Sequence, residues 1–343
     1  MTITIKEVAK AAGVSASTVS RALSGDKRVN EKTRKRIEKL ARELHYTPNF
    51  SAKALIGKGT KLIGLIVPEI SSNYYTQIID FVEAFLDQKG YSLLIGTTGW
   101  SWEKGVNNLN VFIGRNVDGI IYADNVHPDA AAFLQSDSRL GQLPFLVLGR
   151  TGGPIVRESI VVDEGHGISL LIGHLASLGH RTIGFVGEDI SSNVRLPLFR
   201  AALAQAGLPY VESCVKAAGA ERFEAGGYLR MKELLAEPVR PTAVFASYDY
   251  LAMGAIHAAR EAGLKVPEDI SVVGFDNVRE SEYISAPLTT VHPPIMEMAQ
   301  RAVDLLIETI QSEASRNRPP AMTTLYPQLV IRQSSSHPPG GAN

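Results

Sequence analysis

The chain has 343 residues and no formal net charge, with 35 basic and 35 acidic side chains. No stretch approaches the roughly 18 apolar residues that a membrane span needs, and residues 1–20 contain no apolar signal segment. The single cysteine, Cys214, excludes an internal disulfide bond and suits a reducing compartment. We therefore expect a cytoplasmic protein that does not enter a membrane.

Two short helices around a glycine turn are predicted at the start of the chain. Thr4 and Glu7 fit a capping box, which begins the first helix. Gly13 supplies the turn, and Ser15 caps the second helix. Apolar residues recur along the first helix with helical spacing, at Ile5, Val8, Ala9 and Ala12. The pattern predicts a helix-turn-helix, in which the second helix enters the major groove of DNA.

The residues expected to contact DNA lie at the start of the first helix, on the exposed face of the second helix and just beyond it. They are Thr4, Ile5, Ser15, Ala16, Ser17, Thr18, Ser20, Arg21 and Arg28. Ala16 and Ser17 are short, so their direct base readout should be modest, through a thymine methyl group and a hydroxyl contact. Arg21 should add contacts to phosphates and base edges.

A third helix follows, with Asn30 as its N-cap, an apolar stripe on one face and basic residues on the other. A charged helix face is usually just solvated. Here, however, residues 1–60 hold 13 Lys or Arg and 5 Asp or Glu, a net charge of +8, which leaves −8 for residues 61–343. A basic head on an acidic body is typical of a nucleic-acid binder whose affinity depends strongly on salt.

Residues 48–60 are predicted to form a hinge. Asn49 can cap a helix of about two turns, which Gly57 can end. A helix this short is marginal alone in water, so it should become ordered only when a partner holds it. The alternative is a flexible linker in which Leu55 packs on the neighbouring domain.

The run from Ile5 to Arg21 and the following Tyr46-x-Pro48-Asn49 resemble the lactose-repressor (LacI/GalR) family of bacterial transcription regulators. The resemblance extends from about residue 3 to about residue 335. It implies a homodimer on a pseudo-palindromic operator, with paired hinge helices that insert Leu55 into the minor groove. The hinge residues implied to contact DNA are Asn49, Ser51, Ala52, Lys53 and Leu55. Lys53 stands where the family usually has arginine, which keeps the charge but loses a planar fork.

The rest of the chain alternates short apolar runs with amphipathic stretches, which predicts parallel sheets covered by helices. Its length is too great for one core, so we expect two α/β lobes with a ligand cleft at the carboxyl ends of their strands. The resemblance implies a fold similar to periplasmic sugar-binding proteins, and the break points place chain crossings near residues 160, 290 and 322. The expected parts are 1–47 (helix-turn-helix), 48–60 (hinge), 61–160 with 291–322 (first lobe), 161–290 with 323–335 (second lobe) and 336–343 (disordered tail).

Polar and aromatic residues that follow the predicted strands are candidates for effector contacts. By motif position they are Tyr74, Tyr75, Tyr122, Ser191, Arg195, Tyr248, Asp249 and Asp276. Carboxylates accept from hydroxyls, arginine donates several bonds, and aromatic faces cover apolar surface, so this set suits a small polyhydroxylated ligand. The aromatic residue that stacks on the effector in many relatives falls at Arg222 or Phe223, an offset of one residue that the sequence leaves open.

Other classes of protein remain to be weighed. The α/β body could host catalysis, but the sequence shows no nucleophile elbow, no Gly-x-Gly-x-x-Gly or phosphate-binding loop and no His/Cys spacing typical of a metal site. A plain solute-binding protein would not need residues 1–56. We therefore predict a homodimeric regulator without cofactor or metal, a repressor of carbohydrate-utilisation genes that responds to a sugar. The alternative is a regulator that depends on a co-repressor or responds to a nucleoside or phosphosugar.

Overall fold

The computed structural model describes residues 3–23, 26, 28–46, 59–123, 140, 143–150, 157–312 and 319–340. The chain divides into two compact units, Met1–Thr60 and Lys61–Asn343, which are considered separately. The hinge residues Asn49, Ser51, Ala52, Lys53 and Leu55 lie outside the described residues. The hinge helix therefore stays a prediction. Within the described residues, no helix is long and apolar enough to cross a membrane.

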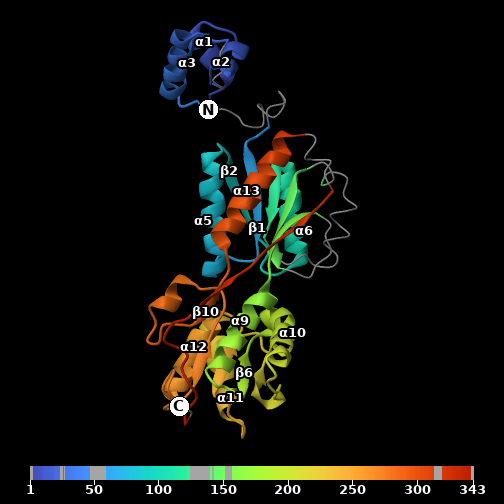
Figure 1. Ribbon diagram of the computed structural model, residues 1–343. Helices are drawn as coiled ribbons and strands as arrows, with labels where there is room; N and C mark the ends of the chain where they lie inside the picture. Colours follow the sequence, from blue (N-terminus) through green and yellow to red (C-terminus); the bar gives the residue numbers. More distant parts are fainter. Residues whose placement is uncertain are drawn as a thin grey trace. The chain divides into compact units, whose positions relative to one another are not determined.

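The first unit contains the predicted helix-turn-helix and the third helix (Figure 1). Its helices are α1 (Ile5–Ala12), α2 (Ala16–Leu23) and α3 (Glu31–Glu43). The Glu7 carboxylate accepts a hydrogen bond from the Thr4 backbone N–H at 2.6 Å, which fixes the start of α1. Gly13 turns the chain with φ 62°, a conformation that favours glycine. Buried apolar residues from all three helices, including Val8, Val19 and Ile37, form one small core.

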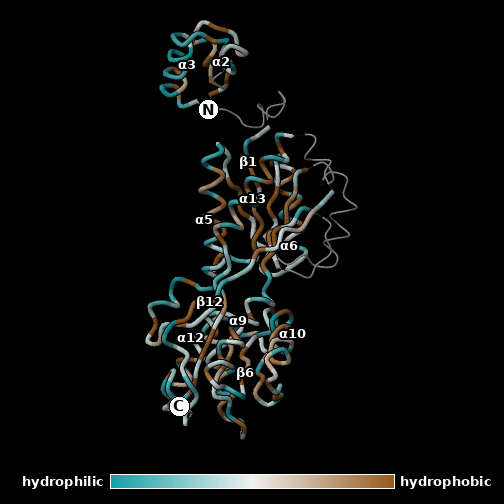
Figure 2. The backbone as a smooth tube through the Cα atoms, viewed as in Figure 1, coloured by the Kyte–Doolittle hydropathy of each residue, from teal (hydrophilic) through white to brown (hydrophobic). Residues whose placement is uncertain are grey.

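The second unit begins with a parallel six-stranded sheet, which we call the first lobe together with its helices. Its strands are β1 (Leu62–Val67), β2 (Ser92–Thr97), β3 (Gly119–Tyr122), β4 (Phe145–Arg150), β5 (Glu158–Val162) and β11 (Met322–Leu325). Their order is β11-β5-β4-β3-β1-β2. Strands such as β1 are almost uniformly apolar because helices cover both faces of the sheet (Figure 2).

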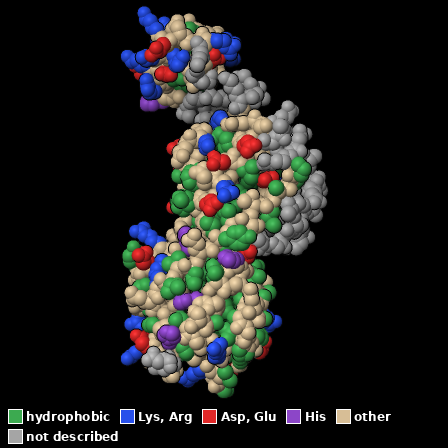
Figure 3. All heavy atoms as spheres, in the orientation of Figure 1, with side chains coloured by type: hydrophobic (Ala, Val, Ile, Leu, Met, Phe, Trp, Pro, Cys, Tyr) green, Lys and Arg blue, Asp and Glu red, His purple; other side chains and the backbone are tan. Residues whose placement is uncertain are grey.

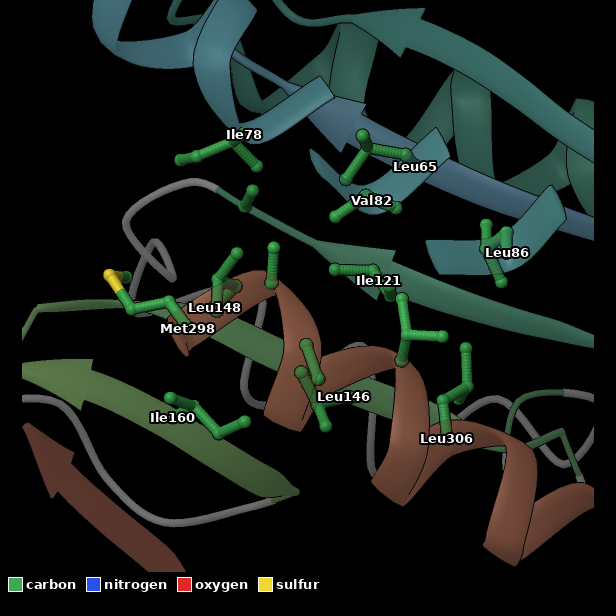
Figure 4. Close-up of a cluster of buried hydrophobic side chains, with 14 of the residues drawn as sticks. Leu65, Ile78, Val82, Leu86, Ile121, Leu146, Leu148, Ile160, Met298 and Leu306 are labelled. Carbon is green, nitrogen blue, oxygen red and sulfur yellow. The ribbon is translucent and has the colours of Figure 1, made fainter. Parts of the chain in front are cut away.

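Helices α5 (Asn73–Gln88) and α13 (Ile295–Gln311) pack on one face of this sheet. Figure 4 shows Val82 of α5 beside Leu65 of β1, and Leu306 of α13 in the same apolar cluster as Leu146 of β4. Helix α6 (Trp102–Gly114) contributes Phe112 to the core on the opposite face. The first lobe is thus a three-layer α/β structure, as the alternating pattern predicted.

The second lobe has the same architecture with a smaller parallel sheet. Its strands are β6 (Ile183–Val186), β7 (Val215–Lys216), β8 (Ala243–Ala246) and β9 (Ser271–Val273), in the order β7-β6-β8-β9. Helices α9 (Glu164–Ser177) and α10 (Asp189–Gln205) cover one face. Helices α11 (Phe223–Leu235) and α12 (Asp249–Glu261) cover the other. Two short 3-10 turns, η1 (Glu212–Cys214) and η2 (Arg279–Glu282), complete it.

The chain passes between the lobes after β5, through β10 (Thr290–His292), and between β11 and β12 (Gln328–Val330). Strands β10 and β12 pair in a small antiparallel sheet. The predicted crossings near 160 and 322 fall inside or at the start of first-lobe strands. Strands β5 and β11 run together in register until Val162 and Leu325, so the chain leaves the first lobe a few residues later.

The prediction of a disordered tail is wrong for residues 336–340. Ser336 accepts a hydrogen bond on its carbonyl from the His180 ring at 2.9 Å, and its backbone N–H donates to the Ser271 hydroxyl at 3.0 Å. The His337 ring bonds the Leu178 carbonyl at 2.8 Å. Serine hydroxyls and backbone groups thus attach this polar segment to the second lobe, although its composition is typical of disorder.

Candidate functional site

The face of α2 that was predicted to read DNA is accessible. Ser15, Ser17 and Arg21 are exposed, whereas Ala16, Thr18 and Ser20 are half-buried. The Ser15 hydroxyl lies 2.8 Å from both the Ser17 and the Thr18 hydroxyls, so these short side chains form a local network. At the start of α1, Thr4 is exposed and Ile5 is half-buried. Lys and Arg side chains cover much of this unit's visible surface (Figure 3).

Arg28 differs from the other candidates because it already has a partner. Its guanidinium contacts the Asp26 carboxylate at 2.6 Å, and its side chain is 73% exposed. Asp26 is only 11% exposed, so the ion pair joins an exposed cation to a largely buried carboxylate.

A pocket lies between the two lobes of the second unit. It is lined by Glu69, Ser72, Tyr74, Tyr75, Trp100, Glu188, Ile190, Ser191, Arg195, Arg222, Phe223, Tyr248 and Asp276. Six of the eight residues predicted to bind an effector are among them. The remaining space in the pocket is about 30 Å³, which holds only one or two water molecules. Little free space is therefore left between the side chains that line the pocket.

The first-lobe wall of the pocket is aromatic. The loop after β1 leads through Ser72, the N-cap of α5, to Tyr74 and Tyr75 in its first turn. The rings of Tyr74 and Tyr75 meet edge to face with centroids 5.0 Å apart, and Tyr75 meets Trp100 in the same way at 6.0 Å. Edge-to-face contacts of this kind hold the rings in fixed orientations, which gives the ligand a preformed surface.

The second-lobe wall is built around Arg195 of α10, which is only 2% exposed. Its Nε and Nη2 donate to one oxygen of Glu164 at 3.1 and 2.6 Å, and Nη2 also donates to Asp276 at 3.1 Å. A third donor, Nη1, bonds the carbonyl of Ser247. Burial alone lowers the pKa of Arg195, but the charges of Glu164 and Asp276 outweigh it and raise this pKa above its ordinary value. The arginine is thus permanently charged and rigidly held.

Asp276 connects the pocket to a crossing between the lobes. It has φ 106° and is followed by Asn277 with φ 48°, a backbone that non-glycine residues rarely adopt. Its backbone N–H donates to the carbonyl of Val291 in β10 at 2.9 Å. Strained residues of this kind occur at functional sites, where surrounding contacts hold them.

Arg222 and Glu69 form an ion pair between the lobes at the edge of the pocket. Arg222 Nη1 and Nη2 contact the two Glu69 oxygens at 2.6 and 2.8 Å. The next residue, Phe223, donates its backbone N–H to the Tyr248 hydroxyl at 3.0 Å, which places both side chains in the wall. The sequence could not decide whether residue 222 or 223 faces the ligand, and the structure brings both to the pocket.

Two residues predicted to contact an effector, Tyr122 and Asp249, are not among those that line the pocket. Tyr122 is 3% exposed and stacks on Phe145 in the core of the first lobe. Asp249 is fully buried, accepting from the Val278 N–H at 2.8 Å and the Thr290 hydroxyl at 2.6 Å. Burial raises the pKa of Asp249 well above its ordinary value, and the charge of Asp276 adds to this. Asp249 therefore supports the turn after β9 and the crossing at β10.

Ser191 keeps its predicted place but is held by neighbours. Its hydroxyl lies 2.6 Å from the Ser247 hydroxyl, and its backbone N–H donates to Glu188 at 3.0 Å. Glu69 and Glu188 also line the pocket and were not predicted, although each follows a buried strand, as the predicted residues do.

Two family models match the chain. One, described as bacterial regulatory proteins of the lacI family, matches residues 4–49, and a periplasmic binding protein-like domain matches residues 172–335. The transcriptional regulator DegA of Bacillus subtilis is 34% identical over 339 residues, which cover 98% of this chain and 99% of the relative. The chain belongs to the LacI family. The repressor PurR of Erwinia tasmaniensis is 35% identical over 341 residues, 98% of each chain.

Solved LacI-family structures share the fold. The Lac repressor dimer bound to operator and the anti-inducer ONPF has a TM-score of 0.86 at 28% identity, covering 98% of this chain and 100% of the repressor. A complex of the regulator CelR with cellobiose has a TM-score of 0.70 at 28% identity, covering 97% and 99%. This LacI-family chain is accordingly a DNA-binding transcriptional regulator with an effector-binding domain. Membership of this family excludes the two alternative classes considered from the sequence, an enzyme and a plain solute-binding protein.

Proposed function

We propose that this regulator binds a pseudo-palindromic operator as a homodimer in the cytoplasm and represses carbohydrate-utilisation genes. A neutral sugar, bound in the pocket between the lobes, changes its affinity for the operator. The observation that carries the choice of ligand is the charge pairing in the pocket, where both arginines already bind carboxylates.

The pocket's charges favour a neutral ligand over an anionic one. Three lining residues are acidic, Glu69, Glu188 and Asp276, whereas only Arg195 and Arg222 are basic. A phosphosugar would have to displace carboxylates from these arginines and would lie among the remaining negative charges. Hydroxyl groups, in contrast, can donate to the carboxylates while the rings of Tyr74 and Tyr75 cover the apolar face of a sugar. The proposed effector contacts are Tyr74, Tyr75, Ser191, Arg195, Tyr248 and Asp276.

Effector binding requires the pocket to widen. The present space of about 30 Å³ is too small for a sugar, so the lobes or the side chains that line the pocket must move when one binds. A ligand held between Tyr74 or Tyr75 and Arg195 or Asp276 then favours one angle between the lobes. The ligand can change operator affinity only by as much as its affinity differs between the two angles.

The DNA interface is proposed from the exposed face of α2 and from the hinge. In the Lac repressor complex the partner is an operator and the protein is a dimer. By the same arrangement, two copies of Ser17, Thr18 and Arg21 would read adjacent half-sites. Leu55 would enter the minor groove between them and bend the DNA.

A selection from random DNA tests this function. The full-length protein is expected to enrich a symmetric motif, because a two-fold dimer presents two identical reading heads. Neutral sugars, phosphosugars and nucleobases are then screened by thermal shift, since a ligand that binds the folded state raises the melting temperature. Each ligand that does so is tested for its effect on binding to the enriched motif. Enrichment of asymmetric sequences would contradict the dimer. A response to phosphosugars or nucleobases alone would contradict the neutral sugar.

A further inference from the structure

Two buried N–H groups at the pocket have no hydrogen-bond partner among the described residues. They are Nε1 of the Trp100 indole and Nε of the Arg222 guanidinium. Both side chains line the pocket between the lobes. Buried polar groups in folded proteins almost always have a partner, so two orphaned donors in one small pocket call for an acceptor that a ligand supplies.

Trp100 is fixed on the first-lobe side. It lies in the turn after β2 with φ 65°, and its backbone N–H donates to the Thr98 hydroxyl at 3.2 Å. Its ring packs edge to face against Tyr75. The indole N–H therefore has a set position in the first-lobe wall of the pocket.

Arg222 belongs to the second lobe, and its hydrogen bonds to Glu69 hold its guanidinium in place. Nη1 and Nη2 each donate to Glu69, whereas Nε has no hydrogen-bond partner among the described residues. The guanidinium lies 4.6 Å from the centre of the Phe223 ring and 5.3 Å from that of Trp100. The ion pair thus brings the two orphaned donors of opposite lobes into one corner of the pocket.

We infer that Trp100 and Arg222 form a donor subsite for acceptor oxygens of the effector, such as ring or hydroxyl oxygens of a neutral sugar. The inference rests on the proposed function and extends it. The carboxylates of Asp276 and Glu188 favour ligand hydroxyl groups that donate hydrogen bonds. The N–H groups of Trp100 and Arg222 favour ligand oxygens that accept them. Because the two donors belong to different lobes, a ligand that satisfies both stabilises the closed arrangement more than the open one.

Calorimetric titration of the full-length protein tests the subsite. The probe is the sugar that raises the melting temperature most in a panel of neutral pentoses, hexoses and disaccharides that includes D-ribose and cellobiose. Trp100→Phe keeps an aromatic ring but removes the N–H, and its Kd for the probe is expected to rise about three- to tenfold. Arg222→Lys keeps the charge near Glu69 but removes Nε, and it should weaken binding at least as much.

Deoxy analogues of the probe separate a lost hydrogen bond from a general disturbance. The analogue that lacks the oxygen bound by the Trp100 N–H should have the same Kd for the wild type and for Trp100→Phe. This hydrogen bond is absent from both complexes, so removing the N–H has no further effect. Trp102→Phe is the matched control, since Trp102 lies in the first turn of α6 and does not line the pocket. Its Kd should equal that of the wild type.

The outcomes distinguish this subsite from the proposed function. If Trp100→Phe and Arg222→Lys bind the probe as the wild type does while Asp276→Asn does not, the subsite is wrong and the sugar pocket stands. The two N–H groups would then be served by water. If no sugar of the panel binds the wild type, the neutral-sugar proposal and the subsite are both wrong.

Discussion

Replacing Arg195 by alanine is expected to destabilise the effector-binding unit by about 3–5 kcal/mol and to abolish effector binding. The arginine side chain is 2% exposed, and its partners Glu164 and Asp276 are 4% and 13% exposed. Without the guanidinium, two negative charges remain buried close to each other and lose the positive charge that both now contact. Their desolvation is then uncompensated, which is the costly case for a buried ion pair.

Urea unfolding of the variant and the wild type measures this loss. Arg200→Ala is the control on the same helix, because Arg200 is 52% exposed and pairs with Glu212, which is 81% exposed, and with the hydroxyl of the half-buried Tyr210. Its unfolding free energy should change by no more than about 0.5–1 kcal/mol. An Arg195→Ala protein as stable as Arg200→Ala would show that the buried network contributes no net stability.

Replacing Arg21 by alanine is expected to weaken operator binding by about 1–3 kcal/mol for each head of the dimer. Arg21 is exposed in the last turn of α2, in a unit with a net charge of +8 from 13 basic and 5 acidic residues. If Arg21 contacts a phosphate, its loss also lowers the slope of log affinity against log salt, because fewer counterions are released.

Fluorescence anisotropy with the selected operator, measured from low to physiological salt, checks this prediction. Arg301→Ala provides the control, since Arg301 is a 53% exposed cation on α13 of the other unit and pairs with Glu297. It should leave both affinity and salt slope unchanged. Equal losses in the two variants would mean that the overall charge of the protein, and not Arg21, determines the affinity.

Local patterns in the sequence were sufficient for most of the elements. The apolar run Leu62–Val67 is β1 with the same bounds, because a strand covered on both faces shows as a continuous apolar segment. The capping residues Thr4 and Asn30 begin α1 and α3 as predicted. Patterns of this kind report interactions between residues close in the chain, so one sequence contains them.

The pocket depends on contacts that such patterns do not contain. Tyr122 and Asp249 stand at strand ends like the other candidates, but which way a side chain points there depends on distant neighbours such as Phe145 and Thr290. The pair Glu69 and Arg222 is separated by 153 positions in the chain. Only the folded lobes bring these two residues together, and no periodicity in the sequence indicates it.

The most direct test of the account titrates effector into the protein–operator complex and follows operator affinity in the wild type and in Asp276→Asn. Asp276 contacts Arg195 in the pocket and Val291 at the crossing in β10. The operator affinity of the wild type is expected to change when sugar is added. Asp276→Asn should bind operator normally without sugar but need at least about tenfold more sugar to respond, as expected when a charge-assisted bond is lost. A variant that responds at wild-type sugar concentrations would contradict control by a ligand in this pocket.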